Sequence, residues 1–301
     1  MSGRPIPRWI GIALLLVIAT VFGSNHVAAR LAFEHGANVT TAVAFRSTGT
    51  ALFVLALLAW SGISLRVGRG TLARAIVIGL FLALQSYCLY SAVARIPVAL
   101  ALLAFQTFPM LLSLISWAAG GERPSRRVRL AMPVALVGLA LALGIWGGSG
   151  SAAGFAGRWA EVGAGVLWAT GASVSFAMVL FLTTRWLGGT DGRLRSFFIM
   201  SVVAAVTIAG GAAANDFALP ADATGWLGLA LLTVFYGTAI TAMFVLLPRL
   251  GAVNNAAVMN FEPIAVLGIA WAVLGQAVAP LQIAGAFIVV GAIAWLGSGR
   301  Q

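Results

Sequence analysis

Residues 95–122 read RIPVALALLAFQTFPMLLSLISWAAGGE, and residues 249–276 read RLGAVNNAAVMNFEPIAVLGIAWAVLGQ. These stretches lie within residues 79–126 and 233–280, which carry the same landmark residues at a constant spacing of 154 positions and need no gap to align. Similarity at one fixed offset indicates that the chain contains two copies of a single structural unit. The paired landmarks are Phe81 with Phe235, Arg95 with Arg249, Pro109 with Pro263, Trp117 with Trp271, and Gly121 with Gly275.

Each copy holds about five apolar segments that are long enough to cross a membrane, for which about 20 residues are needed. An odd number of spans places the second copy upside down relative to the first, as in the inverted repeats of secondary transporters. The expected fold is an all-α integral membrane protein with ten transmembrane helices, arranged as two inverted five-helix repeats. These repeats are residues 1–150 and 151–301, joined by a Gly- and Ser-rich tether at 147–157. The helices are expected at 9–31, 40–60, 73–94, 97–118, 129–147, 161–184, 196–214, 224–247, 252–273 and 280–297.

Composition and charge agree with a membrane protein. The 301 residues are 61% hydrophobic and 8% charged, which is too little charge to cover a soluble surface. The net charge of +11 does not indicate a nucleic-acid partner, because all 18 basic residues are arginines placed between apolar segments. With the N-terminus inside, 14 arginines lie on the inner face and four toward the outer face. We therefore expect a multi-pass protein of the cell inner membrane with both termini in the cytoplasm.

A family resemblance rests on short runs in both copies. The first copy has Ala92 to Ala99 (AVARIPVA), then Pro109, Trp117, Gly121-Glu122-Arg123 and Gly138. The second has Leu250 to Val253, then Glu262-Pro263, Trp271, Gly275-Gln276 and Gly291. Together they resemble the repeat of the EamA family, within the drug/metabolite transporter (DMT) superfamily. The resemblance implies a ten-helix fold and export of small metabolites, with YddG-type exporters of aromatic amino acids the first members to compare. Gln276 departs from the family, whose repeats often have a glutamate there.

Glu262 is the only acid expected near the bilayer centre. A charged acid at that depth costs about 2.5–3.5 kcal/mol on translocon scales, so it needs protonation, a partner or a wet cavity. One interpretation is a site that exchanges protons or binds a substrate ammonium. The other is a hydrogen-bonded glutamate that ties helices together beside Pro263. Phe108 occupies the equivalent position of the first copy, so the acid is not part of the symmetric scaffold.

Two further features shape the helices. Pro109 and Pro263 lie near the middle of their segments, where a proline removes a backbone hydrogen bond and kinks the helix. They serve either packing or a hinge for alternating access. Small residues at 138–142 and 284–291 should let the fifth and tenth segments pack closely against the fourth and ninth. Pro109 leaves the carbonyl of Phe105 without its usual backbone N–H donor, and Pro263 does the same to the carbonyl of Met259.

Sparse polar and aromatic residues mark a candidate cargo site between the halves, near the midplane. Tyr87 and Tyr90 share one face of the third segment, and Tyr236 and Thr241 share one face of the eighth. These faces line a cavity or make hydrogen bonds between helices. Arg46 either reaches outward to the interface or meets a substrate carboxylate. The candidate substrate-binding residues are Asn25, His26, Arg46, Tyr87, Tyr90, Gln106, Trp168, Ser175, Tyr236, Thr241, Asn260 and Glu262, with Pro109 and Pro263 as candidate hinges.

The function that these features favour is secondary active transport that exports small organic metabolites, most of all aromatic or neutral amino acids. Partners are then the lipid bilayer, a small-molecule substrate and protons as the candidate coupling ion. The alternatives are a channel, a non-transporting membrane scaffold, or an exporter of another metabolite or drug class. An enzyme is not expected, since two histidines, one cysteine and no HExxH motif offer no catalytic constellation. We expect no cofactor and no metal site, and the lack of a GxxxxGK[ST] loop argues against ATP-driven transport.

Overall fold

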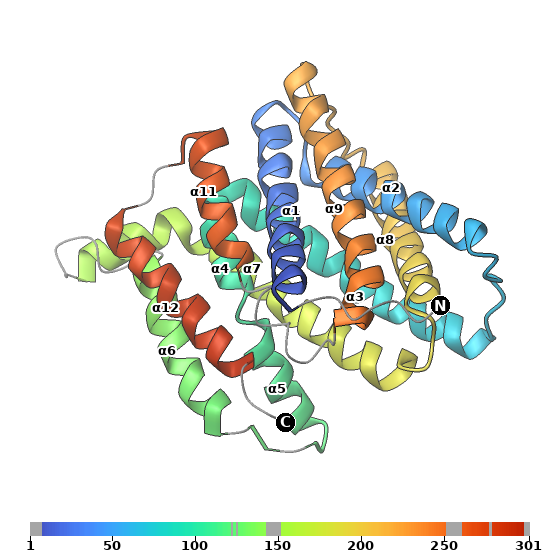
Figure 1. Ribbon diagram of the computed structural model, residues 1–301. Helices are drawn as coiled ribbons and strands as arrows, with labels where there is room; N and C mark the ends of the chain where they lie inside the picture. Colours follow the sequence, from blue (N-terminus) through green and yellow to red (C-terminus); the bar gives the residue numbers. More distant parts are fainter. Residues whose placement is uncertain are drawn as a thin grey trace.

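The computed structural model describes residues 8–121, 123–124, 126–142, 152–250, 261–276 and 279–297, and none of them forms a strand. Figure 1 shows the resulting bundle of helices. The first half contains α1 (Arg8–Glu34), α2 (Val39–Trp60), α3 (Arg69–Arg95), α4 (Val98–Phe105), α5 (Phe108–Ala118) and α6 (Arg126–Ala142). The second half contains α7 (Ala152–Leu187), α8 (Gly192–Ala214), α9 (Ala223–Leu250), α11 (Glu262–Leu274) and α12 (Pro280–Gly297).

The described helices have the length and composition of a membrane protein. Seven stretches are long and apolar enough to cross a bilayer, counting α4 and α5 together as one. Three shorter apolar helices are found within α6, α11 and α12. The all-helical membrane fold expected from the sequence is confirmed.

The contacts between helices repeat when the two halves are exchanged. The 154-residue offset relates α1, α2 and α3 to α7, α8 and α9, and it relates the α4–α5 pair and α6 to α11 and α12. The packing of α3 on α7 has its counterpart in α9 on α1, and that of α3 on α8 in α9 on α2. The pairs α2–α8 and α6–α12 map onto themselves. With five spans in each half, this pseudo-two-fold relation inverts the second half in the membrane.

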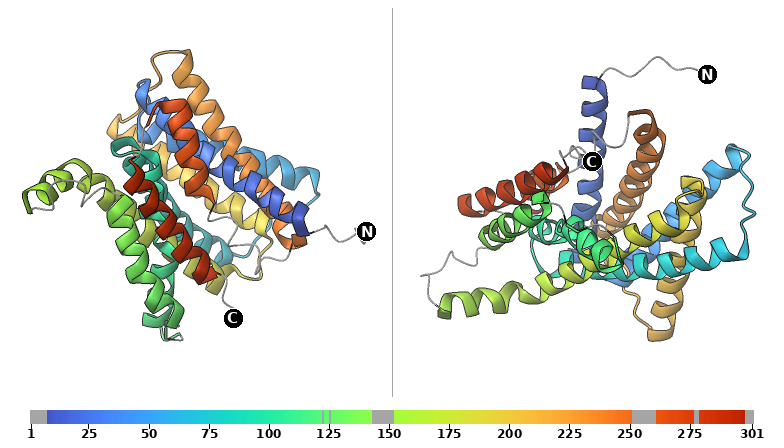
Figure 2. Two further views of the ribbon diagram at one scale, coloured as in Figure 1. Left: turned by 60° about the vertical axis from the view of Figure 1, so that its left-hand side comes forward. Right: turned by 90° about the horizontal axis from the view of Figure 1, so that it is seen from below.

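The fifth and tenth segments pack on each other, not mainly on the fourth and ninth as the sequence suggested. In Figures 1 and 2, α6 and α12 lie side by side at one edge of the bundle. Glycines make this close approach possible: a Cβ added at Gly285 would lie 2.4 Å from the backbone N of Ala142. A Cβ at Gly138 would lie 3.0 Å from the carbonyl O of Gly285. The sequence correctly predicted close packing at these small residues, but the partner of α6 is α12 and not the fourth segment.

The segment expected as one helix at 97–118 is broken into α4 and α5. Gln106 and Thr107 form a turn between them, and Pro109 occupies the first turn of α5. Proline is tolerated in that turn because the N–H it lacks has no intrahelical partner there. The kink expected at Pro109 is therefore a complete interruption of the helix. In the second half, α11 also begins just before its proline, at Glu262.

The start of the sixth segment also differs from the expectation. The sixth segment was expected at 161–184, but α7 begins at Ala152 and ends at Leu187. Residues 152–157, expected as part of a flexible tether, are therefore helical. Alanine is the strongest helix former, and the run Ala152-Ala153 opens this helix.

Candidate functional site

A buried polar cluster lies where α1, α2, α3, α9 and α11 meet, and side chains from both halves form it. Tyr90 of α3 is 1% exposed, and its hydroxyl donates a hydrogen bond of 2.9 Å to Asn25 Oδ1 of α1. The Asn25 side-chain amide donates in turn to the carbonyl O of Phe22. The ring of His26 lies 5.8 Å from the ring of Tyr90. Successive residues Asn25 and His26 thus reach Tyr90 from one turn of α1.

Arg46 of α2 places a buried positive charge in this cluster. Its guanidinium lies 4.2 Å from the ring centre of Tyr236 and 5.1 Å from that of Tyr90, a favourable arrangement for a cation and aromatic faces. Nη2 donates to Ser86 Oγ at 2.7 Å, and the residue is only 4% exposed. Arg46 therefore points into the bundle instead of reaching outward. Among the described residues, no carboxylate lies within ion-pair distance of Arg46, and its Nε has no hydrogen-bond partner.

Glu262 and His26 form the second charged part of the cluster. His26 Nε2 lies 3.5 Å from Glu262 Oε1, and both side chains are largely buried. Glu262 is the first residue of α11, where the helix dipole favours a negative charge. His26 Nδ1 is buried and has no hydrogen-bond partner within the described part of the chain. The equivalent position in the first half, Phe108, packs instead against Phe176, with ring centres 4.9 Å apart.

A serine that was not among the residues singled out from the sequence bonds the backbone carbonyls at the break between α4 and α5. Ser173 of α7 is fully buried, and its Oγ lies 2.8 Å from the carbonyl O of Phe105. The same Oγ lies 3.2 Å from the carbonyl O of Ala104, which also accepts a bond from Thr107 Oγ1. The carbonyl O of Phe105 thus lacks its usual backbone donor, as expected, and the Ser173 hydroxyl donates to it instead. The sequence signal was a group of hydroxyl residues, Thr170, Ser173 and Ser175, in an apolar helix.

Tyr87 and Trp168 lie apart from the Arg46 cluster. Their ring centres are 5.9 Å apart, and Arg95 lies over the Trp168 ring at 5.5 Å. Tyr87 is 40% exposed and lines a cavity of about 430 Å³ between α3 and α8, while Tyr90, one turn on, is buried. The two tyrosines were expected to share one face of the helix, but Tyr87 borders the cavity and Tyr90 is buried in the Arg46 cluster.

The remaining candidates fall in three places. Gln106 is buried at the α4–α5 break, and Ser175 is buried in α7 two residues after Ser173. Pro263 is buried in the first turn of α11. Asn260 and Met259 lie outside the described residues, as does the side chain of Thr241.

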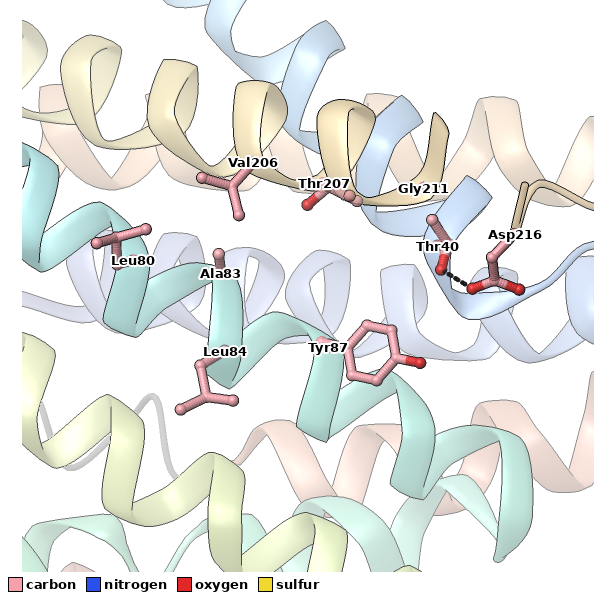
Figure 3. A pocket seen from close by; sticks show the side chains of 10 residues that line it. Thr40, Leu80, Ala83, Leu84, Tyr87, Val206, Thr207, Gly211 and Asp216 are labelled. Carbon is pink, nitrogen blue, oxygen red and sulfur yellow. Dashed lines mark hydrogen bonds between the residues drawn. The ribbon is translucent and has the colours of Figure 1, made fainter. Parts of the chain in front are cut away.

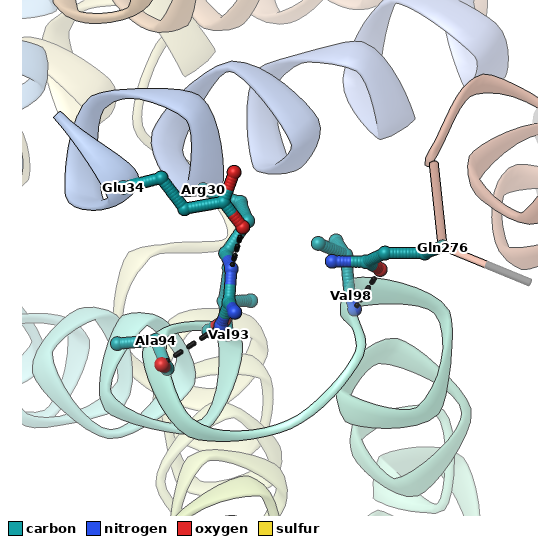
Figure 4. Close-up of polar contacts among 6 residues, drawn as sticks. All are labelled: Arg30, Glu34, Val93, Ala94, Val98 and Gln276. Carbon is teal, nitrogen blue, oxygen red and sulfur yellow. Dashed lines mark hydrogen bonds and ion pairs between the residues drawn. The ribbon is translucent and has the colours of Figure 1, made fainter. Parts of the chain in front are cut away.

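Polar contacts fasten the bundle at the end where α1 finishes, which we call the Glu34 end. Figure 4 shows Arg30 bonding Glu34 at 2.8 Å and donating to the carbonyls of Val93 and Ala94 at 2.9 and 2.8 Å. It also shows Gln276 of the second half, whose Oε1 accepts from the backbone N of Val98 at 3.2 Å. Gln276 therefore satisfies an N–H at the start of α4 that the helix itself leaves unpaired.

Two loops join the halves at the same end. His35 Nδ1 lies 2.7 Å from Asp222 Oδ2, and the backbone N of Ala221 donates to the carbonyl O of His35 at 2.8 Å. Asn38 donates to Asp216 at 2.9 Å. The pKa of Asp222 lies below its usual value, because the backbone N–H of Gly225 and the His35 ring both bind the carboxylate. We call these loop contacts, 35–38 with 216–222, the Glu34-end latch.

At the opposite end, the described polar links between the halves are weaker. Arg193 Nη1 donates to Ser61 Oγ at 3.1 Å, and Arg74 Nη1 donates to the carbonyl O of Trp186 at 3.5 Å. All these contacts involve exposed side chains.

Comparison with known proteins agrees with this architecture. A solved protein crystal structure superposes with a TM-score of 0.62 at 19% sequence identity, covering 96% of this chain and 97% of the other, which indicates a shared fold. No curated protein gives a significant match. A sequence model of the EamA-like transporter family matches twice, at residues 9–144 and 163–298, so the second match is displaced from the first by the same 154 positions. The chain therefore belongs to the EamA-like transporter family of membrane proteins, in the DMT superfamily.

Proposed function

We propose that the protein exports neutral and aromatic amino acids across the inner membrane by alternating access, with both termini in the cytoplasm. Membership in the EamA-like family supports transport of a small molecule through a membrane. The observation that carries the choice of cargo is Arg46, a buried cation without a carboxylate partner among the described residues. An unpaired buried charge is unfavourable, so an anionic group of the cargo would complete this site.

The cluster offers two opposite poles for a zwitterion. The cargo carboxylate is assigned to Arg46, which keeps unused N–H donors and suits a bidentate contact. The cargo ammonium is assigned to Glu262. Tyr90 contacts Arg46 directly and is linked to Glu262 only through His26. Asn25 supports the site by holding the Tyr90 hydroxyl.

Aromatic rings beside Arg46 support a preference for apolar or aromatic cargo side chains. Phe22 and Tyr236 meet edge to face with ring centres 5.8 Å apart, and Tyr236 also faces Arg46. Tyr236 was among the candidate substrate-binding residues from the sequence, and Tyr87 and Trp168 lie apart from this cluster. Gln106, Ser175, Thr241 and Asn260 stay proposed substrate-binding residues.

Alternating access and proton coupling follow from the same residues. The α4–α5 break before Pro109 and the start of α11 at Pro263 are the proposed hinges, since an interrupted helix can bend without breaking further backbone hydrogen bonds. The Glu262–His26 pair is proposed to exchange a proton, and cargo ammonium and proton would compete for the same carboxylate. Competition of this kind is what proton-coupled export requires.

The test uses Arg46→Gln protein in proteoliposomes, with efflux of labelled phenylalanine and of phenethylamine, which lacks the carboxylate. Hydrogen bonds to a charged group contribute about 1.5–3 kcal/mol, so phenylalanine efflux should fall roughly 10- to 100-fold. Phenethylamine efflux should change little. Arg74→Gln, at an exposed arginine of α3, is the matched control and should transport both compounds normally.

An equal loss of phenylalanine and phenethylamine efflux in the Arg46→Gln protein would contradict the assignment. Arg46 would then hold the helices together and not bind the cargo carboxylate. Faster efflux of phenylpyruvate than of phenylalanine by the native protein would also contradict it. The native cargo would in that case be an organic anion without an ammonium group.

A further inference from the structure

The cavity of about 430 Å³ lies on the side of the bundle, between α3 and α8, and Figure 3 shows the side chains that line it. The two helices meet at Gly79, where an added Cβ would lie 2.6 Å from Val202. Toward the Glu34 end the start of α2 closes the back of the cavity, since a Cβ at Gly211 would lie 2.6 Å from Thr40 Cγ2. We call this wedge-shaped cavity the α3–α8 groove.

The α3–α8 groove changes from apolar to polar along its length. Leu80, Leu84 and Val206 line it on the side of the Gly79 crossing. Tyr87 and Asp216 line it at the Glu34 end, where the Tyr87 hydroxyl points toward Asp216 in Figure 3. The groove thus suits a molecule with an apolar tail and a polar head.

Asp216 gives the polar end a negative charge. Its carboxylate accepts hydrogen bonds from Thr40 Oγ1 at 2.6 Å and from Asn38 Nδ2 at 2.9 Å. No arginine or histidine among the described residues lies within ion-pair distance of it. The carboxylate is held by neutral donors, so a cationic head would meet an uncompensated charge.

Larger side chains stand at the corresponding place in the other half. Phe53 of α2 stands at the position that corresponds to Thr207 of α8 under the 154-residue offset, and Leu57 stands in the same way for Gly211. Phe53 packs toward α9, with Cδ1 4.0 Å from where a Cβ of Gly237 would lie. The open groove is therefore a departure from the symmetric scaffold, made by small residues on α8, and not a consequence of the packing common to both halves.

We propose that the α3–α8 groove binds a membrane phospholipid with a primary-amine headgroup, with one acyl chain in the apolar part and the ammonium at Asp216. The volume lies within the roughly 300–1,000 Å³ of ordinary ligand sites. The groove opens on exposed faces of two membrane helices, where lipid is the surrounding solvent. A primary ammonium donates three hydrogen bonds, whereas the trimethylated amine of choline donates none. The site should therefore select phosphatidylethanolamine over phosphatidylcholine, whatever the transported cargo is.

The test reconstitutes the full chain into nanodiscs of phosphatidylethanolamine and phosphatidylcholine in equal amounts, with identical acyl chains, and measures retained lipid by native mass spectrometry. An exposed ion pair with good hydrogen bonds predicts about two- to fivefold enrichment of phosphatidylethanolamine on the native protein. Asp216→Asn should bring the ratio to about one, because the amide keeps the groove but loses the charge.

Gly210→Leu tests the groove itself. Gly210 lines the groove, and a Cβ there meets no atom within 4 Å, so leucine fills the lipid position without displacing protein. This variant should lose the retained lipid. Gly268→Leu in α11 is the matched control, because Gly268 also has open space around it and lies outside the groove. If Gly210→Leu does not fold, Thr207→Phe takes its place and copies Phe53 of the other half.

Equal retention of the two lipids by the native protein would overturn the proposal. So would a Gly210→Leu protein that retains as much phosphatidylethanolamine as Gly268→Leu. Displacement of the lipid by micromolar amounts of a soluble lipophilic cation would identify that class as the occupant and would also overturn the assignment to a phospholipid.

Discussion

At the scale of single residues, two charged side chains, Arg46 and Glu262, distinguish the interior of this protein from an ordinary membrane bundle. The two side chains have different surroundings. Arg46 is stabilised by two aromatic faces and a serine hydroxyl, which lower the cost of burial without neutralising the charge. Glu262 has an imidazole nearby and the start of a helix beneath it. Among the described residues, Arg46 and Glu262 do not form an ion pair with each other.

Glu262→Gln should remove the dependence of amino-acid efflux on the pH gradient while leaving exchange of cargo in place. Glutamine keeps the size and the hydrogen-bonding capacity of the side chain but cannot ionise. The measurement is efflux from proteoliposomes with and without an imposed pH gradient. Glu34→Gln, at a more exposed acid of α1, is the control and should behave as the native protein. Unchanged coupling in the Glu262→Gln protein would show that Glu262 only ties α11 to α1.

At the scale of helices, interruptions and glycine contacts decide the shape of the bundle. The α4–α5 break remains stable inside the protein because Ser173 and Thr107 satisfy carbonyls that the broken helix exposes. The crossing of α6 and α12 depends on backbone contact at Gly138 and Gly285, where any side chain would stand in the way. Close backbone approach of this kind is a main source of stability between membrane helices, since lipid tails compete equally well for apolar side chains.

Gly285→Val should separate α6 from α12 and lower the yield of folded protein. A Cβ at Gly285 would lie 2.4 Å from the backbone N of Ala142 and 2.6 Å from the carbonyl O of Gly138, and backbone cannot move aside as a side chain can. Overpacking of this kind costs about 1–3 kcal/mol or more. The measurement is the melting temperature and monodispersity of purified protein in detergent. Gly291→Val, two turns along the same helix with open space around it, should melt like the native protein. Equal melting of the two variants would contradict the observed crossing.

At the scale of the whole molecule, the two halves are related by a pseudo-two-fold exchange, yet they are fastened unequally at the two ends. The Glu34-end latch joins loops of both halves through charged and amide side chains, and Gln276 adds a contact to α4. The described links at the opposite end are longer and fewer. A separation of the two halves at the Glu34 end would therefore require these contacts to break together.

The latch should weaken in acid. The pKa of Asp222 is lower in the folded protein than its ordinary value of about 3.9, so its contribution is present above that value and is lost as the pH falls through the folded pKa. Asp222→Asn should therefore lower the melting temperature near neutral pH, and the difference from the native protein should shrink below about pH 4. The measurement is a thermal melt across pH in detergent. A constant difference between the two proteins over the whole range would show that Asp222 acts through shape and not through charge.

The sequence by itself determined the repeat, its 154-residue offset and the all-helical membrane fold, because apolar length and odd span number leave few other arrangements. It also singled out Asn25, His26 and Glu262 as unusual polar residues for a membrane interior. It did not determine which of them meet. Tyr87 and Tyr90 lie one turn apart, yet α3 is buried on one side and borders the α3–α8 groove on the other, so only the packing of neighbouring helices separates their surroundings. Ser173 likewise gains its role from the other half, because its hydroxyl bonds the carbonyl of Phe105 at the α4–α5 break. Gly285 packs against the backbone of α6, which lies far from it in the sequence. Local pattern decides what each helix is, and contacts between helices, which no single segment encodes, decide what each side chain faces.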